Sequence, residues 1–230
     1  MATSHLKRLN APKTWKIKRR GLTFITRPNP GPHKMALCMP LNLLLRDMLG
    51  YASTNKEVKT IVNAKEAMIN GKPVTEIKYP VGLFDVLQIP KLDESYRMLL
   101  DTLGYLVLIK IDKKESKLFP AKILGKKMLR GAKMQLNLSA GINLLVEKNH
   151  FKTGETLMLD MPSKNIVEHL KLDKGAYIFL SGGSHIGDHG VVEDVKEDII
   201  FYKSDTGAIL ETPGRFVTIL GNQKSMIALK

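Results

Sequence analysis

The pattern of hydrophobic and polar positions changes near residue 40. Over 1–39, prolines and glycines interrupt the apolar residues so often that no helix or strand longer than a few residues is expected. From Pro40 onward, leucines recur at helical spacing over 41–52, and Gly50 lies where this helix is expected to end. The pattern therefore predicts an extended arm followed by a short helix.

A second helix and a hairpin are predicted next. Thr54 and Glu57 stand three residues apart, which is the spacing of a capping box, and apolar positions follow them at helical spacing. The pair Asn70-Gly71 separates two short runs within 67–74, which is typical of a tight hairpin turn. The run 85–89 has the composition of a further strand.

Short strands are predicted for the rest of the chain. The runs 96–100 and 105–111 form one expected hairpin. The runs 134–138 and 142–146 form another, and 125–131 is the basic loop expected between the two hairpins.

A glycine-rich loop follows the apolar run 175–180. Four glycines occur in the nine residues 182–190, and strands are expected at 199–203 and 216–220. Glycine permits a positive φ and the close approach of another backbone, so this loop is expected to contact some other segment closely.

The charge of the chain is unevenly distributed. Lys and Arg number 36 against 22 Asp and Glu, which gives a net charge of +14, and the excess lies in two acid-free segments. Residues 1–46 carry ten basic side chains and 116–146 carry six. Such segments favour a polyanionic partner, because each phosphate contact releases condensed counterions. We expect the arm to bind RNA and to become ordered on binding.

Two other interpretations of the arm stay open. An organelle transit peptide is likewise basic and poor in acids, although the prolines spoil the amphipathic helix that such signals use. A solvated basic tail would attract nucleic acid only nonspecifically.

Candidate catalytic and metal-binding residues form no familiar set. Cys38 is the single cysteine, so an internal disulfide and a four-cysteine zinc site are excluded, and a small buried apolar role is expected for it. His185 and His189 are four residues apart, but on the predicted loop rather than on a helix face. We expect no catalytic residue, no metal and no cofactor, and the longest apolar stretch is too short to span a membrane.

The segment 40–92 resembles the αL-type RNA-binding domain shared by bacterial ribosomal protein four, many pseudouridine synthases and tyrosyl-tRNA synthetases. The resemblance is carried by Pro40-Leu41, Leu45-Arg46-Asp47, Ala52, Glu57-Val58-Lys59, Asn70-Gly71-Lys72 and Asp85-Val86. In that family two helices and a hairpin present one basic face to structured RNA. The resemblance implies that this face is formed here by Arg46, Lys56, Lys59, Lys65 and Lys72, and the alternative is that they are ordinary surface cations.

The whole chain resembles the eukaryotic and archaeal family of small-subunit ribosomal protein number four. The motifs that carry this resemblance are the opening 5–15, Gly31-Pro32-His33-Lys34, Gly71-Lys72-Pro73-Val74-Thr75, Tyr79-Pro80-Val81-Gly82, the glycine loop and Gly214-Arg215-Phe216. The glycine loop by itself resembles the KOW motif of ribosomal and transcription-elongation proteins. The end at Lys230, without a basic tail, favours the archaeal type.

The resemblance implies an α+β fold that is mostly β. Its order is an extended basic arm over 1–39, the αL-type RNA-binding domain over 40–92, a central β domain over 93–172 and a small KOW barrel over 173–230. The glycine loop departs from many members, which have Arg or Lys where Asp188 and His189 stand here. Direct phosphate contact from this loop is therefore in doubt, and a protein or solvent would face it instead.

The function implied is that of a structural, non-catalytic component of the small subunit of cytoplasmic ribosomes. It would bind small-subunit rRNA by phosphate neutralisation and shape recognition, with neighbouring ribosomal proteins as further partners. No membrane, small-molecule substrate or second copy of the chain is expected. Besides the αL-type residues, the predicted RNA-binding residues are Lys7, Arg8, Lys13, Trp15, Lys16, Lys18, Arg19, Arg20, Arg27, His33, Lys34, Lys126, Lys127 and Arg130. For Trp15, packing on the protein is the alternative to stacking on a base.

Two rival functions remain. A free RNA-binding regulator of translation or transcription is compatible with the KOW motif. An RNA-modifying enzyme of the pseudouridine synthase type would need the catalytic aspartate that follows a Gly-Arg-Leu run in those enzymes, and this sequence has no such run.

Overall fold

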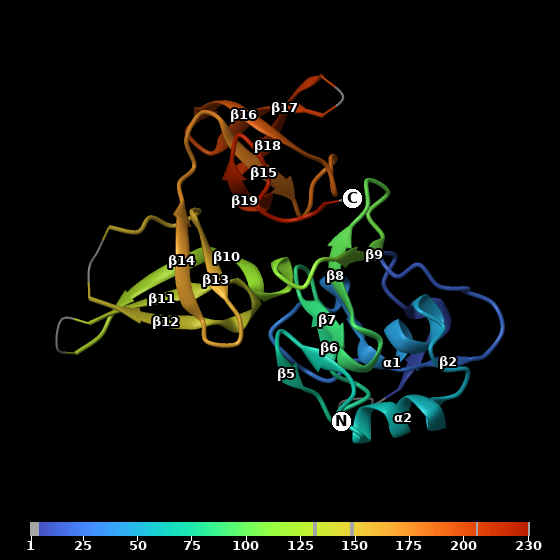
Figure 1. Ribbon diagram of the computed structural model, residues 1–230. Coiled ribbons are helices and arrows are strands. Elements are labelled where there is room, and N and C mark those ends of the chain that lie inside the picture. Colours follow the sequence, from blue (N-terminus) through green and yellow to red (C-terminus); the bar gives the residue numbers. More distant parts are fainter. Residues whose placement is uncertain (1–4, 131–132, 148–149, 206, 230) are drawn as a thin grey trace. The chain divides into compact units, whose positions relative to one another are not determined.

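The chain folds into two compact units. Figure 1 shows the computed structural model. The structure describes residues 5–130, 133–147, 150–205 and 207–229. Unit 1 comprises Met1–Leu99 and Tyr105–Lys117, and unit 2 comprises Leu100–Gly104 and Leu118–Lys230. No helix in the described ranges has both the length and the apolar content needed to cross a lipid bilayer.

Unit 1 contains a five-stranded sheet with the order β5-β4-β7-β8-β9. Its strands are β4 (Met68–Ile69), β5 (Lys72–Pro73), β7 (Val86–Ile89), β8 (Glu94–Leu100) and β9 (Leu106–Ile111). Asn70 and Gly71 connect β4 to β5 with φ angles of 51° and 74°, as the two-residue turn requires. The predicted hairpin is confirmed.

Two short helices lie in the same unit. The helix α1 (Leu41–Leu43) continues into a π turn, η3 (Leu44–Met48), and leucines 41 and 43 to 45 are fully buried. The helix α2 (Asn55–Asn63) is capped by Thr54, whose Oγ1 accepts a hydrogen bond from the Glu57 backbone N–H at 3.3 Å. The Glu57 carboxylate in turn accepts from the Ser53 N–H at 2.8 Å, so the predicted capping box is present.

The arm packs on unit 1. Its regular elements are short: β1 (Leu6–Lys7), η1 (Arg8–Asn10), β2 (Phe24–Ile25) and η2 (Met35–Leu37). Trp15 is only 1% exposed, and its indole N–H donates to the Cys38 carbonyl at 2.8 Å. The Leu106 N–H donates to the Thr14 carbonyl at 2.8 Å, which holds the arm beside β9.

The expectation that the arm stays unfolded until it binds RNA is therefore wrong for residues 5–39. The arm is extended in the sense that it lacks long helices and strands. It nevertheless buries the large ring of Trp15 and the side chains of Ala11 and Ile25, and this burial offsets part of the entropy cost of ordering.

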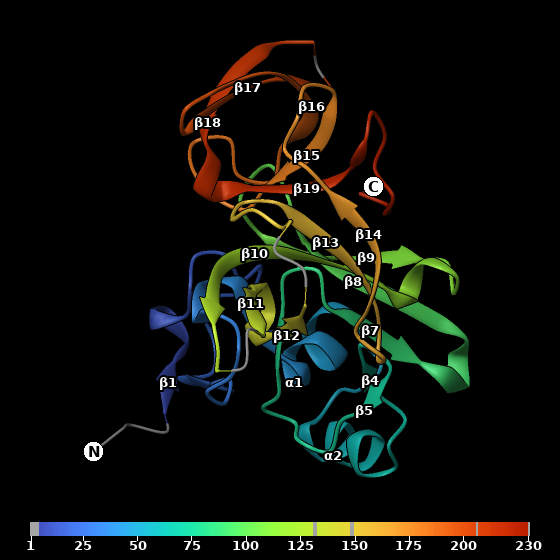
Figure 2. The same ribbon diagram turned by 90° about the vertical axis from the view of Figure 1, so that its left-hand side faces the viewer.

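Unit 2 contains two five-stranded sheets. The first has the order β12-β11-β10-β13-β14 and consists of β10 (Leu118–Met128), β11 (Met134–Leu138), β12 (Asn143–Val146), β13 (Thr156–Asp160) and β14 (Asn165–Leu170). Figure 2 shows β10 as one long curved strand. Its first half pairs with β13 and its second half with β11, with an irregularity between Ile123 and Gly125.

The course of β10 corrects the predicted loop over 125–131. Residues 125–128 belong to β10, and Gly131 lies outside the described residues. The hairpin predicted at 134–146 is confirmed by the antiparallel pairing of β11 with β12.

The second sheet of unit 2 has the order β18-β17-β16-β15-β19. Its strands are β15 (Ala176–Leu180), β16 (His189–Lys196), β17 (Ile199–Ser204), β18 (Ile209–Pro213) and β19 (Val217–Asn222). Three hydrogen bonds join it, together with the turn before β19, to the first sheet. The Ile219 N–H donates to Thr156 Oγ1 at 3.0 Å, and Lys122 Nζ donates to the Gly214 and Arg215 carbonyls at 2.7 and 3.0 Å.

The predicted fold class is confirmed, because strands and small sheets dominate and the helices are few and short. The strands β8 and β9, which fall within the predicted central domain, lie in the sheet of unit 1 because β7 pairs with β8. The predicted domain boundaries near residues 39, 92 and 172 stay predictions.

Candidate nucleic-acid interface

Six basic side chains of the arm are exposed to solvent. In the described part of the chain none of them forms an ion pair, because the arm contains no acid and no carboxylate from elsewhere in unit 1 approaches them. They are Lys7, Lys13, Lys16, Lys18, Arg20 and Lys34. Their charge is therefore available to a polyanion.

Four lysines outside the acid-free segments do have a carboxylate partner. Lys91 pairs with Glu66, Lys110 pairs with Glu94 at 2.7 Å, and Lys113 pairs with Asp93. In unit 2, Lys174 pairs with Asp194 at 3.0 Å. These four lysine side chains are 64 to 73% exposed, so exposure alone does not distinguish them from the arm lysines. The presence of a carboxylate partner does.

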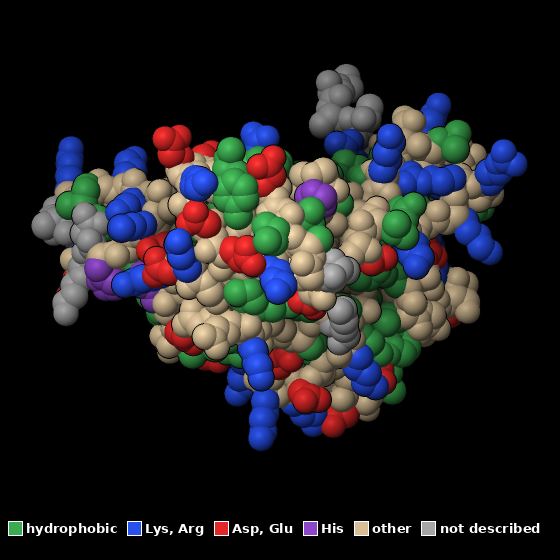
Figure 3. Space-filling view, turned by 90° about the horizontal axis from the view of Figure 1, so that it is seen from above, with side chains coloured by type: hydrophobic (Ala, Val, Ile, Leu, Met, Phe, Trp, Pro, Cys, Tyr) green, Lys and Arg blue, Asp and Glu red, His purple; other side chains and the backbone are tan. Residues whose placement is uncertain are grey.

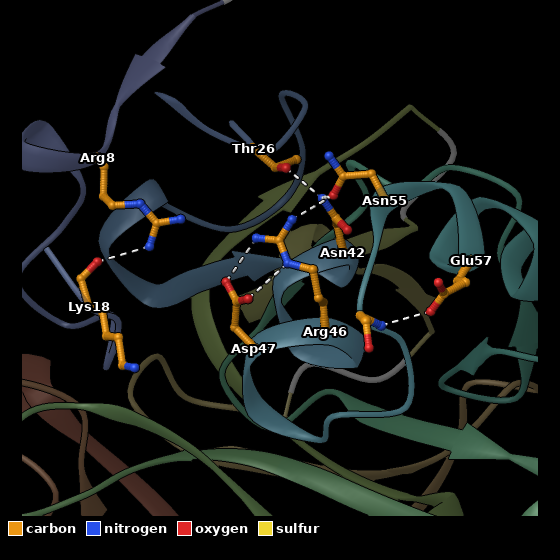
Figure 4. Close-up of polar contacts among 9 residues, drawn as sticks. Arg8, Lys18, Thr26, Asn42, Arg46, Asp47, Asn55 and Glu57 are labelled. Atoms are coloured by element: carbon orange, nitrogen blue, oxygen red, sulfur yellow. Dashed lines mark hydrogen bonds and ion pairs between the residues drawn. The ribbon is translucent and has the colours of Figure 1, made fainter. Parts of the chain in front are cut away.

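Two predicted arm residues point inward. Arg8 is 9% exposed, and its Nη1 donates to the Lys18 carbonyl at 2.9 Å, as Figure 4 shows. Arg19 donates to the Ala11 and Pro12 carbonyls at 2.6 and 2.7 Å. Both guanidinium groups therefore hold the turns of the arm together, and they fix the backbone that carries the exposed lysines. Their role here is structural.

The side chain of His33 also makes a contact within the protein. Its Nε2 lies 2.9 Å from Asp85 Oδ2, and the two side chains are 9% and 4% exposed. A Cβ added at Gly82 would come within 2.2 Å of the imidazole ring, so the ring lies directly against this backbone. Asp85 accepts further hydrogen bonds from the Gly82 N–H and from Asn70 Nδ2, each at 2.7 Å. His33 therefore fastens the arm to the segment 82–85, which precedes β7.

Trp15 adopts the second of its two predicted roles, packing on the protein. With 1% of its surface exposed and its N–H bonded to Cys38, the ring offers no face to a base. Cys38 is itself buried, and this burial, aided by the charge of Asp85, raises the pKa of its thiol to about 11. The expected apolar role of Cys38 is consistent with this setting.

Arg46 lies on the π turn with its guanidinium occupied. Its Nε and Nη2 donate to the two carboxylate oxygens of Asp47 at 2.8 and 3.0 Å, and Nη1 donates to Asn55 Oδ1 at 2.6 Å (Figure 4). The hydrogen bond to Asp47 raises the pKa of Arg46. Since Asp47 neutralises this charge, Arg46 is a weaker phosphate ligand than its sequence position suggests.

The remaining αL-type cations are exposed. Lys56 and Lys59 stand three residues apart on α2, so they are neighbours on its exposed surface, whereas Val58 and Val62 are buried. Lys65 follows the end of α2, and Lys72 lies on the β4–β5 hairpin. Among the described residues these four lysines form no ion pair. They extend the cationic surface of unit 1 beyond the arm.

The three cations predicted for a single basic loop are separated. Lys126 and Lys127 are consecutive residues of β10, so their side chains project from opposite faces of the sheet. All three residues are exposed, and Lys126 Nζ donates to the Phe151 carbonyl at 2.6 Å. Unit 2 therefore does not gather them as the sequence suggested.

The glycine-rich loop approaches its own chain. A Cβ at Gly187 would lie 2.2 Å from the Asp101 carbonyl oxygen, and one at Gly182 would lie 2.7 Å from the Phe216 ring. Asp188 accepts hydrogen bonds from Tyr202 Oη and Ser204 Oγ, both at 2.9 Å. The loop thus uses its glycines and its carboxylate inside unit 2.

One face of the molecule carries charges of both signs. Figure 3 views the molecule from the top of Figure 1, where β16 and β17 lie, and in the middle of this face Lys and Arg alternate with Asp and Glu. An alternating surface produces a weaker attraction for RNA than a surface of one sign.

Arm residues also line a hollow of about 420 Å³ in unit 1. Lys13, Lys16 and Arg19 contribute cations to it, and Tyr105 from the start of the β9 segment contributes an aromatic ring. Tyr105 was not among the predicted site residues, since no local pattern places it beside residues that are about ninety positions away. Arg27, the remaining predicted arm residue, is half-buried beside a second hollow.

Within the residues that the structure describes, His, Cys, Asp and Glu form no group of three or more suited to a metal ion. His189 contacts Tyr177 and Asp205, and His169 contacts Glu155 at 2.7 Å.

Comparison with known proteins gives consistent matches along the chain. The model of ribosomal family S4e matches residues 92–166, and the model of the RS4NT (NUC023) domain matches residues 2–36. Small ribosomal subunit protein eS4 of Methanosphaera stadtmanae is 36% identical over 98% of this chain and 95% of its own length. The protein of the same name from Archaeoglobus fulgidus is 41% identical over 85% of this chain and 82% of its own length.

A solved structure is similar as well. The crystal structure of the 30S ribosomal protein S4e from Thermoplasma acidophilum matches with a TM-score of 0.71 and 25% identity, covering 82% of this chain and 97% of that one. The RS4NT match covers most of the arm, which carries six exposed cations without a carboxylate partner among the described residues.

Proposed function

Because the chain belongs to the ribosomal protein family S4e, in its archaeal type, we propose that its exposed arm cations bind the phosphates of small-subunit rRNA. The chain is a structural component of the small ribosomal subunit, and rRNA binding is general to its family. This membership also implies cytoplasmic ribosomes as its location, with rRNA and other ribosomal proteins as its partners.

One observation carries the proposal. The six exposed arm cations have no carboxylate partner in the described residues, whereas four exposed lysines elsewhere each have one. An unpaired cluster of like charges is repulsive in water and is stabilised by a polyphosphate that releases its counterions on contact.

The proposed mechanism is phosphate neutralisation combined with shape recognition. Trp15, Arg8 and Arg19 hold the arm backbone in one conformation, so the positions of its lysines are set before RNA arrives. A preorganised array loses less entropy on binding than a disordered tail does. Specificity then comes from the shape of the folded rRNA rather than from base edges, as is usual for structured RNA.

The second part of the proposed surface lies on α2 and the β4–β5 hairpin. Lys56, Lys59, Lys65 and Lys72 are exposed there, and we assign them to the phosphate backbone of the same rRNA. Arg46, His33, Arg8 and Arg19 are assigned to the fold of unit 1, and Lys127 and Arg130 are retained as separate single contacts.

Proteins of this family are structural, and we propose no catalytic step for the chain. A free regulator would use the same cations on a short RNA. It differs in its partner, because a structural ribosomal protein is recovered with small subunits.

The test compares two variants that each lose four positive charges, at different parts of the chain. Replacing Lys13, Lys16, Lys18 and Arg20 by Gln removes four unpaired cations, and replacing Lys91, Lys110, Lys113 and Lys174 by Gln removes four paired ones. Affinity for transcribed small-subunit rRNA is measured against salt concentration for both variants. We expect the salt slope of the first variant to fall by about 0.7 to 0.9 for each phosphate that is no longer neutralised, and so by about 3 in total.

The second variant is the matched control, since its net charge is the same and its altered positions are also exposed. We expect its salt slope to differ from that of the unaltered protein by less than about 1, because exposed ion pairs contribute little to binding or stability. Equal slopes for both variants would show that total charge, not the arm, governs binding, and would refute the proposal.

A further inference from the structure

The arm bounds a second hollow in unit 1, and its chemistry differs from that of the first. Its volume is about 460 Å³, and it is lined by residues of β1, η1 and β2 together with Arg27 and Met35. β1 is labelled in Figure 2. This volume falls within the usual range for sites that take a small molecule or a single group of a larger one.

An exposed aromatic ring forms part of this hollow. Phe24 is 53% exposed, although a phenylalanine on a strand ordinarily turns its ring toward the core. The β1–β2 register places Lys7 directly opposite Phe24, so the two side chains stand on the same face of the strand pair. The edge of the His5 ring lies against Phe24 with centroids 5.5 Å apart and an interplanar angle of 62°.

Charge limits what can occupy the hollow. Lys7 and Arg27 bring positive charge to its lining, and Phe24 brings an aromatic ring. A ligand there should combine negative charge with a flat apolar surface. An unpaired nucleotide has both, since its base stacks on aromatic rings and its phosphate binds Lys and Arg.

We propose that this hollow holds one unpaired nucleotide of the rRNA, with its base stacked on Phe24 and its phosphate bound by Lys7 and Arg27. Asn10, which also lines the hollow, supplies an amide donor and acceptor for the edge of the base. The inference rests on the proposed function and adds to it a base contact, where the lysines of the arm contact phosphates alone.

The experiment separates the base from the phosphates. Two fluorescein-labelled hexamers are titrated into the full chain: hexauridylate and an abasic hexamer with the same number of phosphates. We expect the unaltered protein to bind hexauridylate about 5- to 100-fold more tightly, the range for one stacked base. Phe24→Leu should abolish this preference with an unchanged salt slope, and Phe24→Trp should keep it.

Leu22→Ala is the matched control, because Leu22 is an arm residue that is 72% exposed and does not line the hollow. It should keep the full preference. Circular dichroism melting establishes that each variant is folded. If Phe24→Leu is unfolded, Phe24→Gln replaces it, because it also removes the ring and suits a position that is 53% exposed.

The outcomes are distinct. Equal binding of the two hexamers by the unaltered protein, with a clear salt slope, overturns this inference and leaves the proposed function intact. A preference retained in Phe24→Leu overturns it as well, and such a result is expected if Phe24 contacts a neighbouring protein instead. Binding of neither hexamer in a salt-dependent manner would overturn the inference together with the proposed function.

Discussion

The basic arm and the glycine-rich loop are both irregular segments rich in turn-forming residues. The arm exposes its charged side chains to solvent, whereas the loop directs the charged side chain of Asp188 to the interior. In the arm, the backbone is fastened by Trp15, Arg8 and Arg19, and the lysines between these anchors face solvent. In the loop, glycines bring the backbone against Asp101 and Phe216, and the charged side chain of Asp188 is turned to internal donors.

This contrast shows when a charged residue belongs to a binding surface. A charge that has a protein partner of good geometry is part of the fold, and one without such a partner must be satisfied by solvent or by a ligand. By this criterion, Lys13 and Lys16 belong to the surface and Arg46 to the fold, although all three lie in or next to the same acid-free segment.

The strongest test of the contrast is to remove the anchor of the arm. Trp15→Ala deletes a fully buried ring and leaves the Cys38 carbonyl without its donor. We expect the free energy of unfolding of unit 1 to fall by about 3 to 5 kcal/mol, as for other large-to-small core changes. Urea unfolding followed by circular dichroism measures this decrease, since the substitution removes the only tryptophan of the sequence.

Leu22→Ala provides the comparison for that variant. Leu22 lies in the same arm but is 72% exposed, so the free energy of unfolding should change by no more than about 0.5 kcal/mol. If Trp15→Ala were as stable as Leu22→Ala, the arm would not be part of the fold of unit 1, and the contrast with the loop would fail.

Local signals made half of the fold predictable from the sequence. The Asn70-Gly71 turn and the Thr54–Glu57 cap depend on residues within a few positions of one another, and both occur as predicted. The sequence pattern does not predict β10, because Pro120 and Gly125 interrupt it. The strand forms nevertheless, since β10 changes its pairing partner from β13 to β11 and its register is irregular between Ile123 and Gly125.

The sequence predicts where the excess positive charge lies, but not which of the basic residues are free to bind a ligand. Composition located the excess cations, and the unpaired lysines of the arm agree with it. Which cations the fold itself uses depends on distant partners: His33 contacts Asp85, and Trp15 packs beside Leu106. No spacing in the sequence encodes such contacts, because they form only after the sheet of unit 1 has brought these segments together.

The second test concerns Lys122, a cation of an acid-free segment that the fold has buried. Burial lowers its pKa to about 8, and the charge of Asp198 opposes this shift only in part. The ordinary pKa of lysine is 10.5, so between pH 8 and 10.5 the unfolded chain binds more protons than the folded one. The free energy of unfolding therefore rises with pH in this window, by about 2 kcal/mol between pH 7 and 10.

Lys122→Met isolates this contribution from that of the tyrosines, which both proteins share. The difference in the free energy of unfolding between unaltered protein and variant should increase by about 2 kcal/mol from pH 7 to 10. Lys127→Met, an exposed change on the same strand, should follow the pH profile of the unaltered protein. A parallel profile for Lys122→Met would mean that Lys122 is solvated, and would return it to the surface cations.

The smallest expected effect is that of Asp188→Asn in the glycine-rich loop. Asp188 accepts from Tyr202, Ser204 and the His189 N–H, and asparagine keeps the shape but makes weaker, neutral hydrogen bonds. We expect the free energy of unfolding to fall by about 1 kcal/mol and rRNA affinity to stay within about twofold. Glu193→Gln removes an equal charge from an exposed position of β16 and should leave both quantities unchanged. A rise in rRNA affinity for Asp188→Asn beyond that of Glu193→Gln would mean that the loop faces phosphate, which would erase its difference from the arm.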